Sequence, residues 1–129
     1  MSQSVNIDHI TYDPVNDEFA LYLVEDGPWP VGHVEMETCL KTIQDRVLAS
    51  VDVAIDGELA RKYPDSVGKT VRVQVDSPSG APKSLCELVH HIEDYIHSAA
   101  DYSKAISGSP YVAGIRVVTG KDLGRFAGA

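Results

Sequence analysis

One apolar stripe constrains the fold of this chain more than any other feature. Its members recur every three or four residues: Met36, Leu40, Ile43, Val47, Val51, Ile55 and Leu59. This spacing places them on one face of a helix, which we expect from about His33 to Lys62. A helix of about 30 residues would be roughly 45 Å long, far longer than a strand. It must therefore bend near Gly57 or extend beyond the sheet that it covers.

Four segments with strand character accompany this helix. They are Val5–Tyr12, Glu18–Glu25, Thr70–Asp76 and Ala113–Thr119. A short turn rich in Asp, Asn and Pro separates the first two, which therefore form an antiparallel hairpin. A second helix is predicted from Ser84, which begins a capping box with Glu87, to about Ile106.

The strand Thr70–Asp76 shows how these elements are layered. Valines alternate with polar residues along it, so one face of the sheet is buried and the other is wet. Both helices must then cover the same face. Right-handed crossovers on one face give the strand order 1-2-3-4 as the simplest sheet. We predict an α/β fold, a two-layer α+β sandwich of order ββαβαβ with a four-stranded mixed sheet and two helices on one face.

Length and charge limit the classes of function. The 129 residues suit one domain over 1–120, followed by a tail over 121–129. The formal net charge of −8 repels phosphate backbones and anionic lipid, so we expect no nucleic-acid or membrane partner. No apolar run approaches the roughly 20 residues of a membrane span, and the N-terminus does not resemble a signal peptide. Cys39 and Cys86 form no motif, and a reducing cytoplasm is the simplest location.

The sequence carries no convincing catalytic or cofactor motif, so we predict no cofactor and lean away from an enzyme. The strongest candidate for chemistry is His90, Asp94 and His97, at helical spacing i, i+4 and i+7. These side chains form a candidate metal site. However, their face lies nearly opposite the apolar stripe of the second helix, so a solvated face with adventitious metal binding is the simpler interpretation.

The wet face of the sheet is the better candidate for function. It is expected to carry Ala20, Tyr22, Val24, Arg72, Gln74, Arg116 and Val118, with His9 or Tyr12 beside them. Such a mixture of aromatic, aliphatic and Arg side chains is typical of interfaces. Trp29, held between two prolines, is either a lid over the end of the core or an anchor presented to a partner. We predict a homodimer or another protein as the partner.

The first 76 residues resemble a family of small bacterial domains of unknown function. The resemblance rests on the strand hairpin over 10–24, Trp29 before the helix, Gly57-Glu58-Leu59 with Tyr63-Pro64, and the valine-rich strand over 71–75. These motifs are structural. The resemblance implies a small α/β domain and lends no activity.

Three functions remain open at this point. The first is a non-enzymatic protein-interaction module, homo-oligomeric and cytosolic. The second is an immunity-type inhibitor whose acidic surface masks a basic toxin, which the charge and small size favour. The third is a small enzyme or a ligand-binding or metal-binding domain, which requires a pocket with convergent polar groups.

Overall fold

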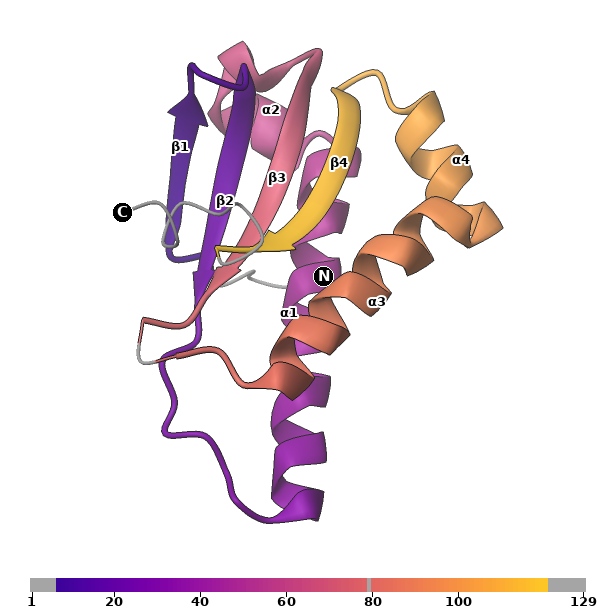
Figure 1. Ribbon diagram of the computed structural model, residues 1–129. Coiled ribbons are helices and arrows are strands. Elements are labelled where there is room, and N and C mark those ends of the chain that lie inside the picture. Colours follow the sequence, from indigo (N-terminus) through magenta and orange to yellow (C-terminus); the bar gives the residue numbers. More distant parts are fainter. Residues whose placement is uncertain (1–6, 79, 121–129) are drawn as a thin grey trace.

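The computed structural model describes residues 7–78 and 80–120, in which one sheet is covered by helices on a single face (Figure 1). Its strands are β1 (His9–Asp13), β2 (Glu18–Val24), β3 (Lys69–Asp76) and β4 (Val112–Thr119). They lie in the order β1-β2-β3-β4. β1 and β2 pair antiparallel, whereas β2–β3 and β3–β4 pair in parallel. The predicted fold class and strand order are confirmed.

The predicted first helix is two helices, α1 (His33–Ile55) and α2 (Glu58–Lys62), followed by a short 3-10 turn over Pro64–Ser66. Gly57 separates them with a φ of +94°, in the left-handed region that favours glycine. The Asp56 carboxylate accepts the Glu58 N–H at 3.0 Å, which begins α2. The predicted bend near Gly57 is therefore confirmed, and α1 also extends beyond the end of the sheet at its N-terminal end, where residues 33–42 are exposed or half-buried (Figure 1).

The predicted second helix is also two helices, α3 (Lys83–Ser98) and α4 (Ala100–Gly108). The prediction of one helix was wrong, because Ala99 is extended at φ −69° and ψ 126°. The predicted capping box is wrong as well. Pro82 is the N-cap, and no side chain caps α3. Ser84 lies inside the first turn instead.

The core fills the space between the sheet and the helices. Its largest fully buried apolar side chains are Leu21, Leu23, Ile43, Val47, Val51, Leu59, Val71, Val73, Leu85 and Ile96. In Figure 1, α1 runs behind the strands, while α3 and α4 lie beyond β4. Burial of these side chains removes apolar surface from water and so holds the helices to one face. The predicted tail over 121–129, and residues 5 and 6 of the predicted first strand, lie outside the described residues.

Candidate interaction surface: the open face and edges of the sheet

The face of the sheet opposite the helices, called here the open face, is built by strand register. Glu18, Ala20 and Tyr22 of β2 lie beside Thr70, Arg72 and Gln74 of β3, and Arg72 lies beside Arg116 of β4. Cross-strand partners share a face, so polar side chains from three strands converge there. β1 adds His9, Thr11 and Asp13, which are paired with Tyr22, Ala20 and Glu18.

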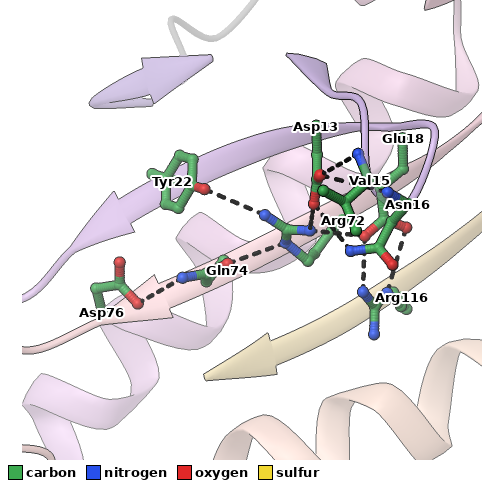
Figure 2. Close-up of polar contacts among 9 residues, drawn as sticks. All are labelled: Asp13, Val15, Asn16, Glu18, Tyr22, Arg72, Gln74, Asp76 and Arg116. Atoms are coloured by element: carbon green, nitrogen blue, oxygen red, sulfur yellow. Dashed lines mark hydrogen bonds and ion pairs between the residues drawn. The ribbon is translucent and has the colours of Figure 1, made fainter. Parts of the chain in front are cut away.

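Arg72 is the centre of a hydrogen-bonded network on this face (Figure 2). Its Nη1 donates to Asp13 Oδ2 at 2.8 Å and to Glu18 Oε1 at 2.7 Å. Its Nη2 donates to the Tyr22 hydroxyl at 3.1 Å, and its Nε donates to Gln74 Oε1 at 2.9 Å. The guanidinium thus links β3 to the β1–β2 hairpin.

Two further contacts extend this network along and across the sheet. Glu18 also accepts from Arg116 Nη2 at 2.7 Å, so one buried carboxylate is shared by two guanidinium groups. Gln74 Nε2 donates to Asp76 Oδ1 at 2.9 Å. Charge-assisted bonds of this kind are stronger than neutral ones and fix the geometry of a surface.

The electrostatics follow from these contacts. The hydrogen bond from Arg72 holds the pKa of the Asp13 carboxyl well below its usual range, with further contributions from Asn16. Burial opposes the charge on Arg72. However, its bonds to Asp13, Glu18 and Tyr22 outweigh that cost, so its pKa is raised and it stays charged. The network therefore favours the charged forms of both Asp13 and Arg72.

The centre of the open face is not wet, which corrects the expectation from sequence. Arg72 is 1% exposed, and Gln74 and Ala20 are fully buried. Val24, at 41%, is the exposed apolar residue of the predicted surface, and Tyr22, Arg116 and Val118 are half-buried. Alternation of residue types cannot reveal this burial, because polar side chains such as Arg72 and Gln74 can be buried once their polar groups are hydrogen-bonded.

Two aromatic residues lie elsewhere than on this face. Tyr12 pairs with Phe19, so it lies on the helix-covered side; of the two alternatives, His9 is the residue on the open face. Trp29 lies between β2 and α1, where it is half-buried and packs against the core. Among the described residues, its indole nitrogen has no hydrogen-bond partner.

The two edges of the sheet differ. At β4, the backbone N–H of Val117 donates to Glu93 Oε1 of α3 at 2.7 Å, and Glu93 also contacts His97 at 3.1 Å. At the other edge, no strand of the described chain pairs with the outer side of β1. An unpaired edge presents main-chain donors and acceptors to another polypeptide.

The predicted metal ligands do not form a site. His90, Asp94 and His97 are exposed along α3, as the helical wheel predicts. Within residues 7–78 and 80–120, no three His, Cys, Asp or Glu side chains are grouped so that they could hold a metal ion. Nor is any described helix long and apolar enough to cross a membrane.

Shallow clefts on the helix-covered side include three that are lined by described residues. One of about 380 Å³ is lined by Asp52, Asp56, Asp101 and Tyr102 between α1 and α4. There, burial raises the pKa of Tyr102 to about 12, and its hydroxyl donates to Asp52. The others are lined by Gln44, Leu48, His91, Ile92 and Tyr95, and by Tyr12, Phe19, Asp65 and Lys69.

No family model, curated protein or solved structure matches this chain. The resemblance to the small bacterial domains therefore stays a prediction, and the surface itself carries the functional argument.

Proposed function

We propose that the protein is a non-enzymatic protein-interaction module that binds an extended strand of polypeptide along the free edge of β1. The contrast between the two edges of the sheet carries the proposal. Glu93 and α3 cover the edge of β4, whereas no described strand pairs with the outer side of β1. Strand addition supplies main-chain hydrogen bonds for affinity, and alternate side chains supply specificity.

β1 lacks the devices that usually block an edge. It contains no Pro or Lys, and its register with β2 is continuous from His9 to Asp13. Its one carboxylate, Asp13, is turned to Arg72 at 2.8 Å and is only 13% exposed. Ile10 and Thr11 are half-buried and Tyr12 is 42% exposed, so an added strand would cover apolar surface as well.

The network of the open face supports this edge. Arg72 ties Asp13, at the end of β1, to β3, so the edge strand is fixed before a partner arrives. A pre-ordered edge reduces the conformational entropy lost on binding. The half-buried thiols Cys39 and Cys86, neither of them in a disulfide, support the cytoplasm as the location.

The test is binding of extended peptides to highly diluted protein. A panel of seven-residue peptides rich in Val, Ile and Thr, with flanking Lys to match the acidic chain, is titrated by fluorescence anisotropy. Each peptide has a matched control with one central N-methylated residue, which removes a main-chain donor. We expect saturable binding that N-methylation abolishes, together with slower amide exchange at Ile10, Thr11 or Tyr12. Equal affinity for both peptide forms, or no saturable binding across the panel, would refute the proposal.

A further inference from the structure

This inference rests on the proposed function and names the partner. We infer that the strand added to β1 is β1 of a second copy of the chain. The two strands run antiparallel about a two-fold axis through Thr11. Homo-oligomers with two-fold symmetry place the same surface on both subunits, so the surface must complement itself. β1 meets this requirement.

The five residues of β1 are complementary to their own reverse. With Thr11 opposite Thr11 of the second copy, Ile10 lies opposite Tyr12 and His9 lies opposite Asp13. These are a Thr–Thr pair, two pairs of a β-branched with an aromatic residue, and two pairs of a His with an acid. The first two types are among the favourable cross-strand pairs. If the register between the two β1 strands shifted by two residues, the five residues would no longer pair in this symmetric way.

The faces agree with this register. His9, Thr11 and Asp13 pair with open-face positions of β2, whereas Ile10 and Tyr12 pair with Leu21 and Phe19 on the helix side. An antiparallel pair about an axis normal to the sheet keeps each residue on its own face. The two open faces would therefore continue into each other, and the Ile10–Tyr12 pairs would lie on the apolar side.

The side chains at this edge are already positioned. The Tyr12 hydroxyl donates to Asp17 at 2.6 Å, and the Lys69 ammonium lies 5.7 Å from its ring centroid. The Asp13 carboxylate accepts from both Arg72 and Asn16. His9 is exposed and would lie opposite Asp13 of the second copy, whose carboxylate stays bonded to Arg72 and Asn16.

A cysteine at the two-fold axis tests the register directly. Residues directly opposite in an antiparallel pair have Cα atoms about 4.5–5.5 Å apart, within the range that a disulfide spans. In a Cys39→Ser, Cys86→Ser background, Thr11→Cys is expected to give a disulfide-linked dimer under mild oxidation. His9→Cys is the matched control from the same face. Its two copies would lie four residues apart along the strand, about 13 Å, and should not cross-link.

Light scattering gives a second, independent measurement. Thr11→Lys places two like charges opposite each other at the axis, so the wild-type dimer should become a monomer that keeps its circular dichroism spectrum. Val15→Lys, in the exposed turn after β1, adds the same charge and should remain a dimer. A monomeric wild type, or cross-linking by His9→Cys as efficient as by Thr11→Cys, overturns this inference.

The two proposals fail in different ways. If the wild type is monomeric but binds extended peptides in a manner that N-methylation and Thr11→Lys abolish, the second copy is refuted and the binding edge stands. If the wild type is monomeric and binds no peptide, both are refuted. A dimer that persists in Thr11→Lys refutes the β1 interface.

Discussion

At the scale of single residues, Glu18 and Arg72 are the most consequential pair. Both are buried on a face that no described helix covers. Glu18 accepts from Arg72 and Arg116, each at 2.7 Å. Buried charges persist only when they are paired and hydrogen-bonded. The pair therefore links the β1–β2 hairpin to β3 and β4. Loss of either member should strongly destabilise the fold, because it leaves a buried charge unpaired.

Removing the central guanidinium should be costly. Arg72→Met leaves Asp13 without its cation and Glu18 with only Arg116, so we expect a loss of about 3 kcal/mol in the free energy of unfolding. Arg116→Met is the matched control. Its side chain is 36% exposed, and we expect a loss of about 1 kcal/mol or less from it. Urea denaturation measures both, and equal losses would contradict the central role of Arg72.

Asp13 should make stability depend on pH. Its native pKa lies below its unfolded value because Arg72 and Asn16 stabilise the anion. Its contribution is therefore complete above the unfolded pKa of about 4 and is lost as pH falls through the native pKa. The destabilisation caused by Asp13→Asn should be largest near neutral pH and should shrink on acidification. In an Arg72→Met background most of this pH dependence should disappear; if it remains, Arg72 is not its cause.

At the scale of elements, the break between α1 and α2 depends on one glycine. Gly57 has a positive φ, and a Cβ built there would lie 2.7 Å from Cζ of Tyr111. The backbone conformation and the close approach both exclude a side chain. The break turns the chain so that Leu59 of α2 is buried in the same core as α1.

Gly57→Ala should destabilise the fold by more than about 1 kcal/mol, the usual cost of a left-handed non-glycine residue, because the contact with Tyr111 adds to it. Gly68→Ala is the control, since Gly68 has a φ of +80° with nothing near its missing Cβ. In thermal unfolding, Gly57→Ala should lower the melting temperature more than Gly68→Ala does. Adding Tyr111→Ala to Gly57→Ala should recover part of this difference in melting temperature. If nothing is recovered, a clash with Tyr111 is not the cause.

The edge of β4 depends on a side chain of α3. Glu93→Ala leaves the Val117 N–H without its acceptor, and a hydrogen bond to a charged group contributes about 1.5–3 kcal/mol. We expect the free energy of unfolding to fall by an amount within that range, and the Val117 amide to exchange faster. His97→Ala removes the other contact of Glu93 and should leave that amide protected. An unchanged exchange rate in Glu93→Ala would show that α3 alone covers the edge.

The helix boundaries show which local sequence features predicted the ends of the helices correctly. The stripe from Met36 to Leu59 predicted α1, and Gly57 signalled its interruption. The break at Ala99 could not be predicted from the sequence, because alanine favours helices, whereas its backbone here is extended between α3 and α4. Ser84 matched a capping box, but the chain turned at Pro82 two residues earlier.

At the scale of the whole molecule, topology could be predicted more completely than the surface. Alternation in β3 placed the helices on one face, and this gave the strand order. The network was missed, although Glu18 shares the parity of Ala20 and Tyr22 and so belonged to the open face. Its contact with Arg72 depends on the register between strands 54 positions apart, which no local pattern specifies.

Net charge should set the salt dependence of the proposed dimer. Two chains of formal charge −8 repel each other over distances that salt screens. We expect the dissociation constant of the dimer to fall as NaCl rises from about 20 to 300 mM, where the Debye length shortens severalfold. Sedimentation of the wild type at each salt concentration measures this dissociation constant. Weakening by salt would instead indicate that attraction between His9 and Asp13 dominates.

The unequal edges also decide how far assembly can proceed. A sheet with two open edges can add a neighbour on each side, and repetition of that step builds a fibre. Here Glu93 of α3 accepts the Val117 N–H at the edge of β4, so that edge is less available than the edge of β1. Once two β1 strands have paired, the open β1 edge of each copy is used. Growth is therefore expected to stop at the pair, and the bond between Val117 and Glu93 opposes an amyloid-like chain of copies.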